Sequence, residues 1–181
     1  MQLLTRSPQV GGSTGHASIA LAQAFPKLAF TVQDLPIVIG RATSSPLPPA
    51  LVGRIRFTPH DFFQPQPPSS SLASVFLLRL IVQNHPKSAA QTILRNVASV
   101  MKPGALILLN NCILPDPGTV GIRSEALERS KSLFMMQAMN GGDRGEAEFR
   151  ELVEGAGAGL RVREVVRRKG SGLGLIIIEK R

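Results

Sequence analysis

The sequence is poor in features that define several common classes of protein. Its single cysteine, Cys112, excludes a disulfide within the chain and a cysteine-based zinc site. It contains no apolar run of about 18 residues, so no segment is expected to span a membrane. Residues 1–10 also lack the apolar core of a secretory signal. Together these absences predict a cytoplasmic protein in a reducing compartment.

Tryptophan and tyrosine are also absent, although the chain carries a formal net charge of +9. Such a charge favours contact with nucleic acid. However, aromatic residues that stack on bases are few, because only phenylalanine is available. Much of the excess charge alternates with apolar residues near the end of the chain, at Arg161, Arg163, Arg167, Arg168, Lys169, Lys180 and Arg181. We interpret this pattern as a solvated strand face, and no nucleic-acid partner is expected.

The rest of the composition is that of a globular protein. The 181 residues are 43% hydrophobic and 18% charged, which is enough for one domain, residues 1–181, with a substantial core. Strand-like and helix-like patterns alternate after an initial apolar run. Strands are expected at residues 28–32, 54–57, 75–82, 105–109, 160–166 and 173–179, and helices at residues 16–25, 86–101, 122–139 and 146–156.

This alternation predicts an α/β fold, a Rossmann-like and mainly parallel sheet with helices on both faces. The last two strands are joined by a short turn that contains residues 169–172. They should therefore pair as an antiparallel hairpin. The clearest amphipathic face is expected in the helix at 86–101, where apolar residues recur at Ala90, Ile93, Leu94, Val97, Val100 and Met101.

A glycine-rich turn, Gly11-Gly12-Ser13-Thr14-Gly15, lies between the first apolar run and a helical pattern. Asp34 ends the next apolar run. Glycine lets the backbone approach a ligand closely, and the following helix points free N–H groups into the same space. The dinucleotide fingerprint requires a further glycine where Val10 stands, which argues against a nicotinamide cofactor. The pattern favours S-adenosyl-L-methionine, and the alternative is a tight turn that binds no ligand.

Seven segments together are similar to a known family. The chain resembles the catalytic domain of the plant and fungal O-methyltransferases that act on phenols and polyketides. The matching segments keep the family's order and run through nearly the whole chain: VGGSTGH (10–16), VQDLP (32–36), HDFF (60–63), FLLRLI (76–81), NHP (84–86), ILP (113–115) and NGGDR (140–144).

The resemblance implies a seven-stranded fold that binds S-adenosyl-L-methionine. It also implies the cofactor contacts, which are Gly11, Gly12 and Gly15 at the methionine and ribose, Asp34 with Leu35 at the ribose, Asp61 and Phe62 around the adenine, and the basic residue Arg79. Each of these has a purely structural alternative. Asp34 could be a helix N-cap, Asp61 could cap a turn, and Arg79 could extend to solvent from a strand end.

The catalytic positions that the resemblance implies are altered. Where the family has its basic histidine, this chain has Gln83, and an acidic position of the family is Asn111. A further acidic position survives as Asp143. Glutamine cannot accept a proton at neutral pH, so Gln83 could only orient the acceptor hydroxyl. His85 could serve as a substitute base, or it could be an ordinary loop residue.

Two further departures concern metals and the start of the chain. Asn110 and Asn111 do not supply the carboxylates that a magnesium-dependent methyltransferase needs, so no metal is expected. Pro8 falls in a strand that should be central, where it would remove a hydrogen bond of the sheet. The family's N-terminal dimerisation domain has no counterpart here, so we expect a shortened copy or a wrong gene start, with apolar surface uncovered.

Three hypotheses follow. The first is an S-adenosyl-L-methionine-dependent O-methyltransferase domain of secondary metabolism that acts on a phenolic or polyketide-like small molecule. The second is an impaired or truncated relative that only binds the cofactor, as Gln83 and Asn111 suggest. The third, based only on the net charge, is an RNA methyltransferase. Met135, Met136 and Met139 could line an aromatic acceptor or could be core residues.

Overall fold

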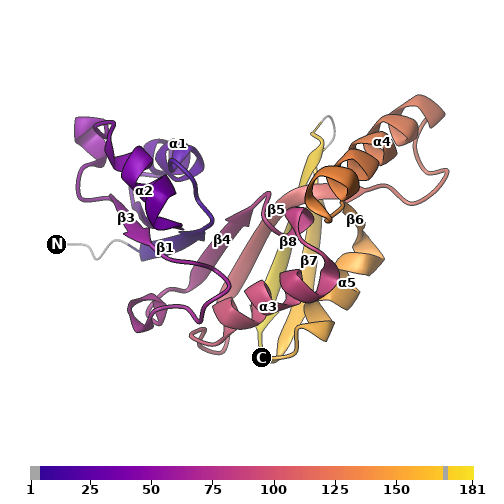
Figure 1. Cartoon of the computed structure of the whole chain (residues 1–181). Helices are drawn as coiled ribbons and strands as arrows, with labels where there is room; N and C mark the ends of the chain where they lie inside the picture. Colours follow the sequence, from indigo (N-terminus) through magenta and orange to yellow (C-terminus); the bar gives the residue numbers. More distant parts are fainter. Residues whose placement is uncertain (1–4, 169–170) are drawn as a thin grey trace.

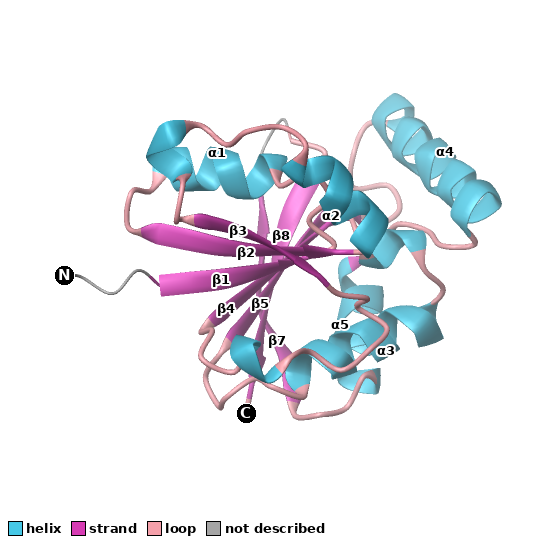
Figure 2. Ribbon diagram, turned by 60° about the vertical axis from the view of Figure 1, so that its left-hand side comes forward, coloured by secondary structure: helices cyan, strands magenta, loops and turns pink. Residues whose placement is uncertain are grey.

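The computed structural model describes residues 5–168 and 171–181 and shows one twisted sheet with helices on both faces (Figures 1 and 2). In these residues the main path of the sheet has the order β3-β2-β1-β4-β5-β8-β7, and β6 pairs with β5 outside this path. The strands are β1 (Thr5–Val10), β2 (Leu28–Asp34), β3 (Ile55–Pro59), β4 (Val75–Arg79), β5 (Leu106–Leu114), β6 (Arg144–Gly145), β7 (Leu160–Arg167) and β8 (Leu173–Lys180).

The first five strands are parallel, and β8 runs antiparallel to both β5 and β7. The predicted Rossmann-like sheet and its antiparallel C-terminal hairpin are therefore confirmed. Two residues of the predicted hairpin turn, Lys169 and Gly170, lie outside the described residues. Within residues 5–168 and 171–181, no helix is both long enough and apolar enough to cross a membrane.

The helices cover the two halves of the sheet on opposite faces. α1 (His16–Ala24) and α2 (Pro36–Thr43) lie against β1, β2 and β3, whereas α3 (Lys87–Ala98) and α5 (Glu146–Gly155) lie against the other half (Figure 2). The connections between these elements contain short 3₁₀ helices, which are η1 (Pro49–Leu51), η2 (Pro68–Ser70) and η3 (Val82–Asn84).

The predicted apolar face of α3 forms the centre of the larger core. Ile93, Leu94 and Val97 are fully buried, and they belong to one cluster with Phe76 of β4 and Ile107 of β5. Because apolar residues recur at helical spacing, one face of α3 can cover the sheet while the other stays in solvent. This packing fixes the carboxyl ends of β4 and β5, where the candidate site lies.

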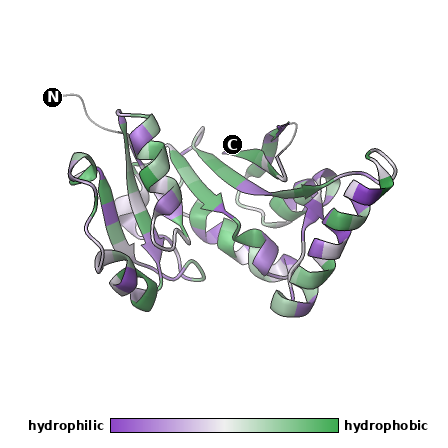
Figure 3. Cartoon of the chain, turned by 90° about the horizontal axis from the view of Figure 1, so that it is seen from above, coloured by the Kyte–Doolittle hydropathy of each residue, from purple (hydrophilic) through white to green (hydrophobic). Residues whose placement is uncertain are grey.

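α4 (Ile122–Met139) extends away from the body of the molecule (Figures 1 and 3). The structure describes the full length of this helix, and none of its residues is buried. Met136 and Met139 are 53% and 48% exposed, so the interpretation of these methionines as core residues is wrong. Their apolar spacing resembles that of a core helix, but no element of the described chain packs over them.

Pro8 does lie in the central strand β1. There it pairs with Thr31 of β2. On the other side, however, the pairing of β1 with β4 contains only Gln9 and Val10. The strand accommodates proline because its pairing with β4 begins one residue later.

Candidate functional site

The glycine turn after β1 packs tightly against neighbouring elements. Gly11 and Gly15 have φ values of +66° and +78°, which favour glycine. A Cβ atom at Gly12 would lie 2.6 Å from Cγ1 of Val32, and one at Gly11 would lie 2.5 Å from Cδ1 of Ile81. Side chains at these positions would therefore force the turn or the side chains of Ile81 and Val32 to shift.

Asp34 lies at this same edge and is bonded to the turn. The backbone N–H of Ser13 donates to Oδ2 of Asp34 at 2.8 Å, and the N–H of Leu35 donates to Oδ1 at 2.8 Å. The N-cap of α2 is Leu35 rather than Asp34, so the N-cap alternative for Asp34 is wrong. Each carboxylate oxygen keeps a second lone pair for a ligand hydroxyl.

Asp61 and Phe62 lie beside the turn. Oδ1 of Asp61 accepts a hydrogen bond from the N–H of Phe63 at 2.9 Å, so Asp61 does cap a turn of its own loop. A Cβ atom at Gly11 would lie 3.4 Å from the ring of Phe62. The backbone turn, the Asp34 carboxylate and the Phe62 ring therefore meet at one end of the sheet, as the sequence predicts.

Arg79, at the end of β4, faces the first residue of α1. Its Nη1 lies 3.4 Å from Nε2 of His16, and both side chains line a cavity of about 490 Å³ with Leu77, Leu108 and Leu175. The N-terminus of α1 carries partial positive charge and has no acidic residue in its first turn. A guanidinium next to a helix N-terminus suits a carboxylate ligand, which the methionine end of S-adenosyl-L-methionine has.

A cavity of about 460 Å³ lies on the other side of η3. The walls are formed by Gln83, Cys112, Leu127, Ser130, Lys131, Phe134, Met135 and Asp143. Nδ2 of Asn111, a fully buried residue of β5, donates to Oε1 of Gln83 at 3.0 Å. This bond holds the amide of Gln83 and leaves its Nε2 donors for the cavity. We call this space the acceptor cavity.

Asp143 is the surviving acidic position, and it is only 9% exposed. Its Oδ1 has no hydrogen-bond partner among the described residues, and the same holds for Oδ1 of Asn111. Burial raises the pKa of Asp143, and the negative charge of Glu128 raises that pKa further. The structure thus places a buried, poorly solvated carboxyl group on the wall of the acceptor cavity.

The segment that carries Asp143 is pressed against η3. The N–H of Gly142 donates to the carbonyl oxygen of Gln83 at 2.7 Å, and a Cβ at Gly141 would collide with that same oxygen. The guanidinium of Arg144 donates to the carbonyl oxygens of Val82 and His85, at 2.8 and 2.9 Å. These contacts set the position of Gln83 relative to Asp143.

Leu80 lies between Arg79 and η3 with a φ of +57°, which is unusual for a leucine. Its N–H donates to the carbonyl oxygen of Asn110 at 2.9 Å. Backbone strain of this kind concentrates at functional sites. The strained residue turns the chain from the end of β4 toward η3 and the acceptor cavity.

His85 lies elsewhere. The described residues that line the acceptor cavity do not include it. Its ring packs edge-on against Phe62 and Phe63, with ring centroids 5.6 and 5.3 Å apart. Burial lowers the pKa of His85, and the charge of Arg144 lowers it further. The structure thus brings Gln83, Asn111 and Asp143 together and leaves His85 beside the aromatic pair.

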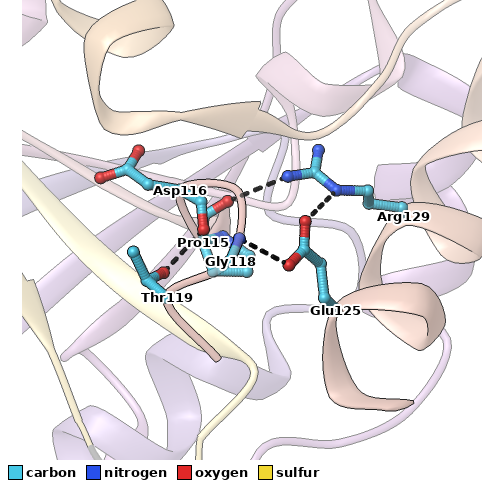
Figure 4. A network of polar contacts seen from close by, with 6 residues as sticks. All are labelled: Pro115, Asp116, Gly118, Thr119, Glu125 and Arg129. Carbon is cyan, nitrogen blue, oxygen red and sulfur yellow. Dashed lines mark hydrogen bonds and ion pairs between the residues drawn. The ribbon is translucent and has the colours of Figure 1, made fainter. Parts of the chain in front are cut away.

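The outer wall of the acceptor cavity comes from α4, and the connection before this helix is held by polar contacts (Figure 4). Oε2 of Glu125 accepts from the N–H of Gly118 at 2.9 Å, and its Oε1 accepts from Nε of Arg129 at 2.8 Å. Nη2 of Arg129 also reaches the carbonyl oxygen of Pro115 at 3.4 Å. The network fixes where α4 begins and so which of its faces meets the cavity.

Several cavity residues are not among those predicted from the sequence. Leu127, Lys131 and Phe134 recur at helical spacing on the face of α4 that includes the predicted Met135, and this spacing is the signal that identifies them. Cys112, which the sequence links only to disulfides and metals, also lines the cavity. The role of Arg144 had no sequence signal beyond its place in a matching segment.

The strand order, the glycine turn and the acid at the end of β2 define an α/β domain of the S-adenosyl-L-methionine-dependent methyltransferase class. The family model described as O-methyltransferase domain matches residues 1–159. The chain therefore belongs to the O-methyltransferase domain family, as the matching segments predict.

Relatives and solved structures agree with this assignment. The chain is 44% identical over 171 residues to O-methyltransferase VdtC of Byssochlamys spectabilis and 37% identical over 174 residues to O-methyltransferase pgmB of Aspergillus terreus. It covers 39% of each of these proteins, and 92% and 94% of the chain is matched. The solved structure of LepI in complex with SAM matches 98% of the chain and 43% of LepI, with 26% identity and a TM-score of 0.81.

The cofactor prediction is confirmed at the level of the class, which uses S-adenosyl-L-methionine. The residues at the carboxyl edge suit this group, because they offer a carboxylate for ribose hydroxyls and a cation for a carboxylate. The RNA methyltransferase hypothesis is not favoured. The family assignment argues against it. Arg161 and Arg163 of β7 are also ion-paired with Glu179 of β8, so part of the charge on which this hypothesis rests is already neutralised.

Proposed function

We propose that this chain is the catalytic part of an S-adenosyl-L-methionine-dependent O-methyltransferase that methylates the hydroxyl group of a phenolic or polyketide-like small molecule. The chain spans about two fifths of the length of the relatives it matches, so the activity of the whole protein is part of this proposal. The observation that carries it is the buried carboxyl group of Asp143, whose Oδ1 has no partner within the described part of the chain, on the wall of the acceptor cavity beside Gln83.

The cofactor side is assigned as follows. The backbone of the turn at Gly11, Gly12 and Gly15 and the Asp34 carboxylate would hold the nucleoside, while Arg79 and the N-terminus of α1 would hold the carboxylate. Leu35, Asp61 and Phe62 would border the ribose and adenine. Bound S-adenosyl-L-methionine supplies an electrophilic methyl group on a sulfonium centre.

The acceptor side then performs orientation and proton transfer. Nε2 of Gln83 donates a hydrogen bond to the acceptor oxygen, since its Oε1 is occupied by Asn111. The proton of the acceptor hydroxyl would pass to the carboxylate of Asp143. The freed oxygen lone pair would form the bond to the methyl carbon as the bond from that carbon to sulfur breaks and S-adenosylhomocysteine leaves. A phenol has a pKa near 10, so an aspartate with a raised pKa accepts its proton more readily than an ordinary one.

The apolar lining suits a flat ring. Leu127, Phe134 and Met135 offer carbon and sulfur surfaces on one side of the cavity. Its volume of about 460 Å³ lies in the range of small-molecule sites, about 300–1,000 Å³. These properties support a small aromatic acceptor rather than a polymer.

The test compares wild type, Asp143→Asn and Gln83→Leu for methyl transfer to a panel of phenols. We expect turnover by the wild type, a loss of about 100-fold or more in Asp143→Asn, and a smaller loss in Gln83→Leu. All three proteins should be stabilised by S-adenosylhomocysteine, because neither change touches the cofactor side. Turnover by Asp143→Asn at the wild-type rate would contradict the role of Asp143.

A second candidate function is cofactor binding without catalysis, and the amides at Gln83 and Asn111 favour it. This alternative predicts thermal stabilisation by S-adenosylhomocysteine but no wild-type turnover on any phenol. Replacing Gln83 by histidine would restore the family's residue at that position. Activity that appears only in Gln83→His would support the second function and exclude the first.

A further inference from the structure

Another cavity lies on the half of the sheet formed by β1, β2 and β3, away from the acceptor cavity. α1 packs on one face of these strands, where Ala22 meets Phe30, Val32 and Ile55. On the opposite face, the connection from β3 to β4 contains only the short η2. A cavity of about 470 Å³ lies between this connection and the strands.

The strands present polar side chains to this cavity. Register places Thr31 of β2 beside Arg56 of β3, and Gln33 beside Thr58. All four line the cavity together with Arg6 of β1. The inner strands of a sheet covered on both faces usually carry aliphatic residues there, as the core half of this sheet does. These polar side chains therefore suit water or a polar ligand rather than an apolar core.

The cavity carries two positive charges. Nη1 of Arg6 donates to the carbonyl oxygen of Phe30 and Nη2 donates to that of Gly53, each at 3.1 Å. These bonds hold the guanidinium against the backbone of β2 and of the turn before β3. A guanidinium has five N–H donors, so others remain for a ligand. Burial lowers the pKa of Arg6, and the charge of Arg56 lowers it further. Among residues 5–168 and 171–181, no carboxylate forms an ion pair with Arg6 or Arg56.

A buried amide faces the same space. Gln33 is 1% exposed, and its Nε2 donates to Oγ of Ser70 at 3.5 Å. Its Oε1 has no hydrogen-bond partner within the described part of the chain. A buried acceptor without a donor is costly. The wall of the cavity thus contains a buried amide with an unused acceptor, in addition to its two guanidinium groups.

We propose that this cavity binds a small hydroxylated metabolite that carries an oxyanion, either a phosphate or a carboxylate. The oxyanion lies between Arg6 and Arg56, and the hydroxyl groups of Thr31 and Thr58 add hydrogen bonds. A hydroxyl of the ligand donates to Oε1 of Gln33. The cavity volume accommodates such a molecule, and guanidinium groups match the geometry of both oxyanions.

The test measures thermal shift and calorimetric binding of three probes at constant ionic strength: inorganic phosphate, glycerol 3-phosphate and malate. We expect saturable binding of glycerol 3-phosphate or malate, tighter than that of inorganic phosphate because of the hydroxyl group. The probe that binds more tightly identifies the oxyanion. Arg56→Gln should weaken this binding about tenfold, and Thr31→Val should weaken it by a smaller factor.

Arg41→Gln is the matched control, since it removes the same charge from α2 on the opposite face. It should bind the probes as the wild type does. Equal weakening in Arg41→Gln and Arg56→Gln, or no binding of any probe by the wild type, would overturn the proposal. Every variant should keep its response to S-adenosylhomocysteine, so a failure here is distinct from a failure of the methyltransferase assignment.

Discussion

Gly141→Ala should disrupt the contact that joins the Asp143 segment to η3. A Cβ at this position would collide with the carbonyl oxygen of Gln83, and would lie 2.7 Å from the carbonyl carbon of Asn84 and 2.8 Å from the backbone nitrogen of His85. All three are backbone atoms, so no side-chain rotation can relieve the overlap. The segment must therefore move away from η3.

The cost has two parts. The hydrogen bond from Gly142 N–H to the Gln83 carbonyl oxygen, now 2.7 Å long, would be lost, at about 1 kcal/mol. Overpacking adds about 1–3 kcal/mol. The free energy of unfolding should fall by about 2–4 kcal/mol in total. For a chain of this size, that corresponds to a fall in Tm of roughly 4–16 °C.

The assay is thermal unfolding with and without S-adenosylhomocysteine, together with methyl transfer. Gly121→Ala is the matched control, because Gly121 has a φ of −58° and no described atom lies within 4 Å of its added Cβ. We expect Gly141→Ala to lose Tm and turnover but to keep its ligand-induced shift, while Gly121→Ala matches the wild type. If Gly141→Ala melts at the temperature of Gly121→Ala and retains turnover, the segment does not position the site.

Three other predictions concern pH and packing. The pKa of Asp143 is raised in the folded chain, so the free energy of unfolding should fall as pH rises from about 4 through that raised value, and turnover should rise over the same interval. Asp143→Asn should remove this pH dependence from urea unfolding. An unchanged profile in Asp143→Asn would refute the raised pKa. Leu94→Ala should lower the free energy of unfolding by about 2–5 kcal/mol, because Leu94 is fully buried in α3. Leu133→Ala on exposed α4 should change it by about 0.5 kcal/mol or less. Equal losses of the two variants in urea titrations would contradict the assigned core. Gly40→Ala should raise the free energy of unfolding by about 0.5–1 kcal/mol, because Gly40 is inside α2 with open space around its added Cβ; a lower Tm would show that α2 needs glycine there.

The sequence was sufficient for the fold class and for the meeting of the glycine turn with Asp34 at the carboxyl edge of the sheet. The alternation of elements and the face of α3 depend on local spacing, which the sequence shows directly. The glycine turn and Asp34 lie at the ends of adjacent parallel strands, so their proximity follows from topology.

Other features depend on contacts between distant parts of the chain. The strand predicted at residues 105–109 continues to Leu114, because β8 pairs with Asn110, Asn111 and Cys112. Two adjacent asparagines give no local sign of a strand. The hold of Arg144 on η3 likewise depends on a partner far away in the sequence. The exposure of α4 follows from the lack of a covering element in the described chain, which local spacing does not show. The cytoplasmic location, the single-domain organisation and the missing dimerisation domain stay predictions.

The isolation of α4 has a consequence for how acceptor preference can diverge. Because this helix contributes no side chain to the core, substitutions at Leu127, Lys131 or Phe134 reshape the pocket wall with little penalty to folding. Substitutions in α4 should therefore change the shape of the acceptor cavity at little cost in stability. The glycine turn at the carboxyl edge should tolerate fewer substitutions, because its added side chains would meet neighbouring atoms. Under the proposed function, new acceptors would therefore be acquired by substitutions along one helix, without compensating replacements elsewhere.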